Sequence, residues 1–259
     1  MGKRIYYCNN VGHETWNADF LEFLNQYKNP DTEITVGSLS PGLPTNNEYG
    51  YFRMLTGEET IHSLLRAERE GYDAAIIGCF CDPWLEAARE ILSRMVVVGP
   101  CESSCHILAP IAGSFSVVTV RRKEILMMKE RIVGYGFGEQ LASMRQLNIA
   151  VCDLDKDRAY TRRRIREEIR AAVEEDGAEG IILGCTCETG CFADLQEEFR
   201  VPVIDAAVAA LKYAEYLTDI KTCAGWQTCR RGKYEAPSRE EILSAGIDKT
   251  FAAEDIWRI

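Results

Sequence analysis

Long apolar runs and histidine are both scarce in this sequence of 259 residues. No stretch reaches the ~20 uninterrupted apolar residues that a bilayer-spanning helix needs, and the first segment, MGKRIYYCNN, has no apolar signal region. The three histidines, His13, His62 and His106, are too far apart to suggest one set of metal ligands. We therefore expect a cytoplasmic protein with no membrane partner and no histidine-based metal site.

A surplus of positive charge is also missing. Lysine and arginine number 30 against 40 for aspartate and glutamate, which gives a net charge of −10. Because nucleic acids are bound through basic surfaces, this balance argues against a nucleic-acid partner and favours a small molecule. Hydrophobic residues make up 46% of the chain. That fraction allows the core of one large α/β unit or of two halves of ~100–130 residues each.

Cysteine, in contrast, is frequent, with 11 residues. An odd count in a chain of this length is not typical of a secreted disulfide framework. Cys101 and Cys105 are separated by three residues, as are Cys187 and Cys191, whereas structural zinc sites usually contain Cys-x2-Cys. The spacing favours a protein without metal, and a non-catalytic thiol-binding or metal-binding protein remains an alternative.

Helical and strand-like patterns alternate along the chain, which is typical of a parallel sheet covered by helices. Strands are predicted at residues 4–7, 74–78, 115–120, 147–151 and 180–183, among others. The residues after Leu217 form an appended tail, in which Ser238 and Glu241 have the spacing of a capping box. The sequence therefore predicts an α/β protein with a C-terminal extension.

An internal repeat is the most informative feature of the sequence. A shift of 106 positions places residues 71–98 on residues 177–204 without a gap and superimposes Cys79 on Cys185. Identical residues meet at eight positions: Gly71, Ile76, Gly78, Cys79, Cys81, Ala87, Arg94 and Val97. Any two strand–helix–strand units share glycines and aliphatic residues, but the matched Cys-x-Cys after the matched glycine favours a duplication.

In each copy of the repeat, a Gly-Cys pair lies where an apolar strand ends and a helix is about to begin. Ligands bind at this carboxyl edge in open α/β sheets, and the positive end of a helix favours a thiolate. Two halves facing each other would present Cys79 and Cys185 to opposite sides of one cleft. One thiolate could remove a proton from a tetrahedral carbon while the other thiol delivers a proton from the opposite face. The intermediate carbanion or enolate needs hydrogen-bond donors, for which Thr119 and Thr186 are candidates. Inert buried cysteines are the alternative.

Several stretches resemble the aspartate/glutamate/hydantoin racemase family, and the hydantoin racemase branch most closely. They are IIGCFCDP around Cys79, FSVVTV at residues 115–120, YGF at residues 135–137, DGAEGIILGCT ending at Thr186, and VPVIDAAVAALKYAEYL. The resemblance extends from about Ile5 to Leu217 and is densest after Gly71. It implies a cofactor-independent racemase or epimerase that acts on a hydantoin-like or amino-acid-derived substrate.

The resemblance also implies an architecture and a set of site residues. We expect two pseudo-symmetric, flavodoxin-like parallel-sheet domains with the active site between them. Residues 1–112 with about 205–259 would form the first half and the tail, and residues 113–204 the second half. Cys79 and Cys185 would be the acid–base pair, with no pyridoxal phosphate, no metal and no other cofactor, in a homo-oligomer. The implied substrate-binding residues are Asn9, Asn10, Phe80, Cys81, Thr119 and Thr186.

The chain departs from the branch around the expected pocket. The first turn reads CNNVGHETW in place of a tighter Asn-Pro-Asn-Thr, and the loop at residues 38–50 lacks a Ser-Ile-Glu piece. Cys81 and Cys187 occupy positions that are usually small, and they could be pocket walls, redox-sensitive thiols or metal ligands. Isomerisation or decarboxylation on the same fold is a second hypothesis, although relatives with that chemistry tend to have one cysteine and this chain has both.

Metal removal tests the prediction of a cofactor-independent enzyme. We expect activity to survive EDTA, because the cysteine spacings do not match a metal site. Alkylation with iodoacetamide should abolish activity, and substrate should protect against it. Loss of activity on chelation, with recovery on addition of one metal, would support the metal-binding alternative instead.

Overall fold

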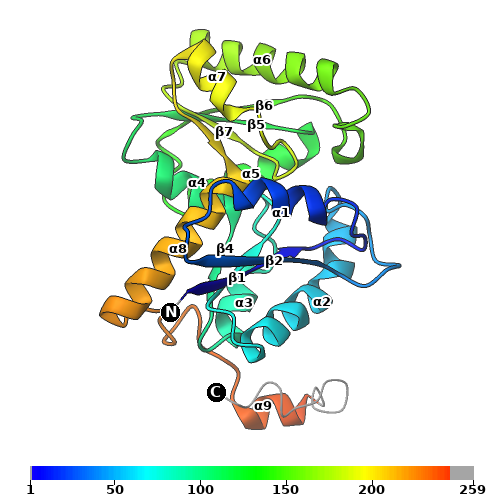
Figure 1. Ribbon diagram of the computed structural model, residues 1–259, viewed down its shortest axis with the longest axis vertical. Coiled ribbons are helices and arrows are strands. Elements are labelled where there is room, and N and C mark those ends of the chain that lie inside the picture. The colour runs from blue at the N-terminus through cyan, green and yellow to red at the C-terminus, as the bar shows by residue number, and fades with distance from the viewer. Residues whose placement is uncertain (1, 246–259) are drawn as a thin grey trace.

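The computed structural model describes residues 2–245 of the chain. Two parallel sheets lie one above the other in an elongated molecule, each flanked by helices (Figure 1). The strand orders are β2-β1-β3-β4 and β6-β5-β7-β8, so the second sheet repeats the order of the first. The predicted fold class, α/β with two related parallel-sheet units, is confirmed.

The first sheet is built from the N-terminal part of the chain. Its elements are β1 (Lys3–Asn9), α1 (Asn17–Asn25), β2 (Thr32–Ser38), α2 (Gly50–Arg69), β3 (Ala74–Ile77), α3 (Leu85–Ile91), β4 (Val96–Val98) and α4 (Pro100–Leu108). β1 pairs with both β2 and β3, and Ile5 of β1 lies opposite Ile34 of β2 and opposite Ala74 of β3. All four residues of β3 are buried, because helices cover both faces of the sheet, as is usual for parallel sheets.

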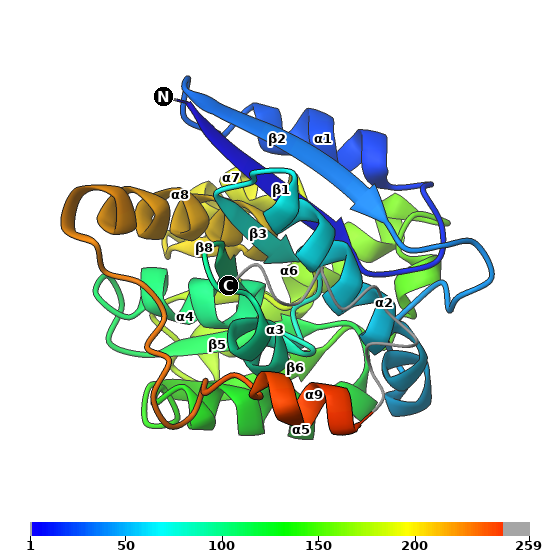
Figure 2. The ribbon, with the colours of Figure 1, turned by 90° about the horizontal axis from the view of Figure 1, so that it is seen from below.

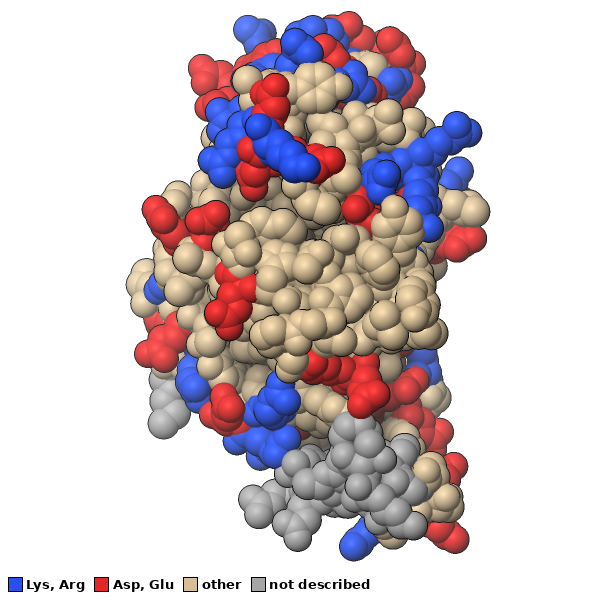
Figure 3. Space-filling model, turned by 90° about the vertical axis from the view of Figure 1, so that its right-hand side faces the viewer, with Lys and Arg blue, Asp and Glu red and all other residues tan. Residues whose placement is uncertain are grey.

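The second sheet has the same construction. Its elements are β5 (Phe115–Thr119), α5 (Arg122–Gly134), β6 (Leu141–Gln146), the 3₁₀ turn η1 (Val151–Asp153), α6 (Arg158–Glu174), β7 (Ile181–Leu183), α7 (Phe192–Phe199) and β8 (Val203–Asp205). β5 and β7 are completely buried, which explains why their apolar runs were recognisable in the sequence. The charged residues of α6 lie at the top of the molecule, where blue and red atoms intermingle in Figure 3.

The strand predicted at residues 147–151 is wrong. The strand between β5 and this segment is β6, which pairs with β5 and ends at Gln146, and Asn148 has a left-handed φ of +60° that interrupts any strand. Leu147 and Ile149 are nevertheless buried against the α6 side of the core, so their alternation imitates a strand. β6 lies at the sheet edge and is only partly buried, and its polar sequence LASMRQ therefore has no apolar signal.

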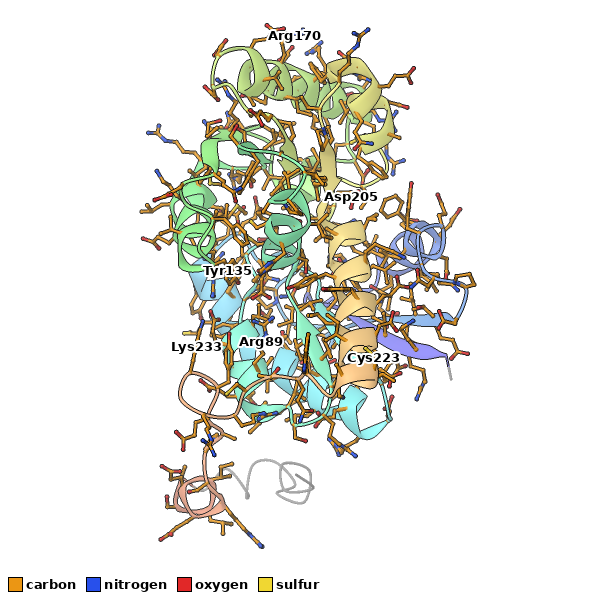
Figure 4. All side chains as sticks on the ribbon, turned by 90° about the vertical axis from the view of Figure 1, so that its left-hand side faces the viewer. Arg89, Tyr135, Arg170, Asp205, Cys223 and Lys233 are labelled. Atoms are coloured by element: carbon orange, nitrogen blue, oxygen red, sulfur yellow. The ribbon has the colours of Figure 1, made fainter. Side chains whose placement is uncertain are left out.

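Helix α8 (Ala206–Ala224) connects the two sheets. It begins directly after β8 of the second sheet and packs on β3, β4 and α4 of the first half. Figure 4 shows Asp205 at this junction, where its carboxylate accepts hydrogen bonds from the backbone N–H groups of Ala207 and Val208. Leu211 and several alanines on one face of α8 join the core cluster of Ile5. The division of the chain at residues 112 and 205 stays a prediction.

The C-terminal extension returns along the first half (Figure 2). The Arg230 guanidinium donates to the backbone oxygen of Glu90 at 2.6 Å, and Arg89 lies over the ring of Tyr234. α9 (Arg239–Ser244) begins with the predicted capping box of Ser238 and Glu241, which is confirmed. Residues 246–259 of the expected tail lie outside the described residues. Within residues 2–245, no helix combines the length and apolar character that a bilayer crossing requires.

Replacement of Leu211 tests the packing of α8 on the first sheet. We expect Leu211→Ala to lower the free energy of unfolding by about 2–5 kcal/mol, because the side chain is fully buried and its removal leaves a cavity. Leu126→Ala on α5 is the matched control, since Leu126 is 67% exposed, and should change stability by less than about 0.5 kcal/mol. Equal urea midpoints for the two variants would contradict this packing.

Candidate functional site

A narrow cleft of about 50 Å³ lies where the carboxyl ends of β1, β3 and β7 meet. Cys79 and Cys185 both line it, one from each copy of the repeat. The cleft also contains the predicted substrate-binding residues Asn9, Asn10, Phe80, Cys81 and Thr186. Thr119 is not among the lining residues: it is fully buried, and its hydroxyl lies 3.4 Å from the sulfur of Met128.

A glycine precedes each cysteine for the same steric reason. A Cβ on Gly78 would lie 2.5 Å from the ring of Tyr7, and one on Gly184 would lie 2.7 Å from a methyl of Val117. Each glycine N–H donates to the neighbouring strand, Gly78 to the Cys8 oxygen at 2.8 Å and Gly184 to the Val118 oxygen at 2.6 Å. The chain therefore makes the same close turn twice, and each turn delivers a cysteine to the edge of its sheet.

One hydrogen bond connects the two cysteine turns directly. The hydroxyl of Thr186, the residue after Cys185, donates to the backbone oxygen of Gly78, the residue before Cys79, at 3.2 Å. Thr186 is only 4% exposed. In this dry environment the bond ties the second half of the molecule to the turn that carries Cys79.

Asp82 anchors the other end of the Cys79 turn. Its carboxylate accepts from the N–H groups of Cys101 and Glu102 at 2.9 and 2.8 Å, at the start of α4, and from the Tyr135 hydroxyl at 2.9 Å. Burial raises the pKa of Asp82 to about 7. Tyr135 follows α5, so this carboxylate is a second tie between the two halves.

The sulfur atoms occur in neighbouring pairs. A hydrogen bond to Cys79, together with burial, holds the pKa of the Cys81 thiol well above its ordinary value. The same combination, with Cys187 as partner, raises the pKa of Cys185. Cys185 and Cys81 are therefore neutral thiols near pH 7, able to donate a proton rather than accept one.

Two buried glutamates in the cleft were not recognised in the sequence. Glu48 and Glu124 are 3% and 5% exposed, and the Cys81 sulfur lies 3.7 Å from a carboxylate oxygen of Glu124. Burial and the charge of Glu48 raise the pKa of Glu124 to about 7. Arg53 and Arg121 lie at 3.8 and 3.7 Å from Glu124 and Glu48, respectively. In the sequence each is an ordinary acidic residue, and only tertiary folding brings them to the cleft.

Asn10 offers an unused donor. Its side chain belongs to a residue that is 1% exposed, and its amide nitrogen has no hydrogen-bond partner among the described residues. The Asn9 amide, in contrast, is occupied, because it donates to Asn17 at 2.9 Å and to Ser38 at 3.1 Å. Asn10 is therefore the better placed of the two to donate to a ligand.

Metal ligands do not gather in the part of the chain that the structure describes, where no group of three or more His, Cys, Asp or Glu is placed to hold an ion. Cys101 and Cys105 are fully buried in one core cluster with Cys81. Cys79 packs against this cluster, so the buried side chains of Cys101 and Cys105 support the Cys79 turn.

Residues 22–214 match the protein family described as Asp/Glu/Hydantoin racemase. A hydantoin racemase of Pseudomonas sp. (strain NS671) is 35% identical over 215 residues, which cover 83% of this chain and 84% of that protein. Allantoin racemase from Klebsiella pneumoniae superimposes with a TM-score of 0.83 at 27% identity, over 92% of this chain and 95% of that one. Arylmalonate decarboxylase shares the fold, with a TM-score of 0.57 at 17% identity over 89% and 96% of the two chains.

The raised pKa of Glu124 predicts how stability depends on pH. The group has an ordinary pKa of 4.5 and a folded pKa of about 7. Its contribution to stability is therefore complete below pH ~4.5 and is lost as the pH rises through about 7. The loss is on the order of 3 kcal/mol, since a tenfold change in proton affinity corresponds to ~1.4 kcal/mol.

Glu124→Gln should remove this part of the decline in urea unfolding between pH 4.5 and 8, because an amide does not titrate. Glu130→Gln is the control, since Glu130 is exposed on the same helix and should leave the pH dependence as it is in the wild type. Parallel pH profiles for the wild type and Glu124→Gln would contradict the assignment.

Proposed function

The chain belongs to the Asp/Glu/hydantoin racemase family and is therefore an isomerase; on that premise we propose that it racemises a hydantoin by a two-cysteine mechanism. The observation that supports the proposal most directly is the pair of Gly-Cys turns, one from each copy of the repeat, that line a single cleft. The relatives named hydantoin racemase and the structural neighbour named allantoin racemase support a hydantoin ring as the reacting group.

The reaction begins at the C–H bond of the ring carbon beside the carbonyl. The Cys79 thiolate takes this proton, and the electron pair of the broken C–H bond moves into the carbonyl to form an enolate. The Cys185 thiol then gives its proton to the opposite face of the same carbon. The raised pKa of Cys185 suits it to the role of donor in the resting enzyme. The reverse direction uses the two sulfurs in exchanged protonation states.

The enolate oxygen needs a hydrogen-bond donor in a site with little water. The Asn10 amide suits this role because it is buried in the cleft and lacks a partner among the described residues. A donor that is already held in place stabilises developing charge without reorganisation. Phe80 and Thr186 follow the two cysteines and would contact the ring on either side, as the resemblance implies.

We propose that the protein acts in the cytoplasm and as a homo-oligomer, and sedimentation velocity at several concentrations would measure the latter. Decarboxylation receives support only from shared fold, whereas both cysteines and the hydantoin racemase relatives favour racemisation.

Single cysteine variants in D2O test the division of labour between the sulfurs. We expect Cys79→Ser and Cys185→Ser each to lower racemisation of a 5-substituted hydantoin by ~10²–10⁴-fold, because a serine hydroxyl is a much weaker acid than a thiol. Each variant should still exchange the ring proton of the one enantiomer that faces its remaining cysteine. The two variants should therefore show opposite enantiomer preferences in proton exchange, followed by NMR.

Cys152→Ser is the control for these variants, because Cys152 is exposed and does not line the cleft. It should racemise both enantiomers at the wild-type rate. Near-normal racemisation by Cys79→Ser or Cys185→Ser would remove that cysteine from the chemistry.

A further inference from the structure

A second and larger cavity adjoins the cysteine cleft. Its volume is about 280 Å³, against about 50 Å³ for the cleft. Trp16 and Cys187 line both spaces, so one side chain from each half forms the boundary between them. The rest of its wall comes from α1, from the start of α6 and from the turn after Cys185. A group attached to the reacting carbon could therefore extend past Trp16 and Cys187 into this cavity.

The cavity is lined by a buried acidic side chain, that of Glu188. The residue is only 4% exposed, and neither carboxylate oxygen has a hydrogen-bond partner among the described residues. Its backbone is held in place, since its N–H donates to the Cys185 oxygen at 3.0 Å and its own oxygen lies 3.7 Å from the Cys191 sulfur. Buried carboxylates are normally paired or hydrogen-bonded. A buried carboxylate that finds no partner among the described residues indicates that the partner comes from a ligand.

The charges around Glu188 favour a cation. Asp205 is also 4% exposed and has one unpaired oxygen, and its negative charge is among the causes that hold the pKa of Glu188 high, after burial and Cys187. Arg158 and Arg162 line the cavity as well, and Arg158 donates to Asp155 at 2.8 Å. With Asp19, Asp155 and Glu188 in the lining, acidic side chains outnumber these two arginines. No ion pair between an arginine and Glu188 is found among the described residues. A positively charged nitrogen would give the buried Glu188 carboxylate the partner that the described residues do not provide.

We propose that this cavity binds the substituent on the reacting carbon and that Glu188 selects substituents that end in an ammonium or guanidinium group. The inference rests on the proposed function and adds the substrate class: hydantoins derived from basic amino acids. Glu188 is a specificity-determining residue in this account.

Matched substrates test this assignment. Racemisation should be measured for 5-(3-guanidinopropyl)hydantoin, 5-(3-aminopropyl)hydantoin, 5-butylhydantoin and 5-methylhydantoin. We expect kcat/KM for the two cationic substrates to exceed that for the butyl compound by at least ~10-fold. Glu188→Gln should abolish this preference, as expected when one partner of a buried charge pair is removed.

Two further variants make the test specific. Glu188→Met keeps a similar volume without charge, and should reverse the preference toward the butyl compound even if Glu188→Gln fails to fold. Glu197→Gln on α7 is the matched control, since Glu197 is exposed and does not line the cavity, and should show the wild-type preference.

Binding separates this inference from the proposed function. Isothermal titration of the Cys79→Ser/Cys185→Ser double variant with 5-(3-guanidinopropyl)hydantoin should give tighter binding than with 5-butylhydantoin, and the difference should disappear when Glu188→Gln is added. Racemisation of all four hydantoins with no cationic preference, or a preference that Glu188→Gln and Glu188→Met leave unchanged, would overturn the inference and keep the proposed function. Failure to racemise any hydantoin, combined with selective binding of the cation, would overturn the proposed function alone.

Discussion

The hydrogen bond from the Thr186 hydroxyl to the Gly78 backbone oxygen is the contact on which the candidate site depends. It joins the two cysteine turns at the point where two sheets of the same strand order meet. Each turn requires a glycine before its cysteine, because a side chain there would collide with the adjacent strand. The duplication supplies the two turns, and Thr186 connects them. Stereo-inversion needs two groups on opposite faces of one carbon, and this arrangement can provide them.

Burial of acidic groups is the second theme of the structure. Asp82, Glu124 and Glu188 are each at most 5% exposed, and burial raises the pKa of all three. Asp82 accepts three hydrogen bonds and positions the Cys79 turn, whereas Glu188 accepts none among the described residues. Such unpaired buried groups lower stability and are typical of sites that bind something. A ligand that pairs with such a group would therefore raise the stability of the protein.

Much of the architecture could be predicted from the sequence, because buried parallel strands are continuous apolar runs and the Cys-x-Cys repeat is conspicuous. The edge strand β6 could not be predicted, since it is half-exposed and polar, while the buried Leu147 and Ile149 imitated a strand. Glu124 and Glu188 were missed for a different reason. An acidic residue in a loop or first helical turn is usually solvated, and only the three-dimensional arrangement buries these two.

The central claim is that two sulfurs act on opposite faces of one carbon in a shared cleft. The most direct test follows one pure enantiomer of a 5-substituted hydantoin with the wild-type protein in D2O, early in the reaction, by NMR on the separated enantiomers. A two-base mechanism predicts that the product carries solvent deuterium at the ring carbon while the remaining substrate still carries protium. Product that retains the substrate's own proton, or deuterium that appears equally in both enantiomers from the start, would contradict the account.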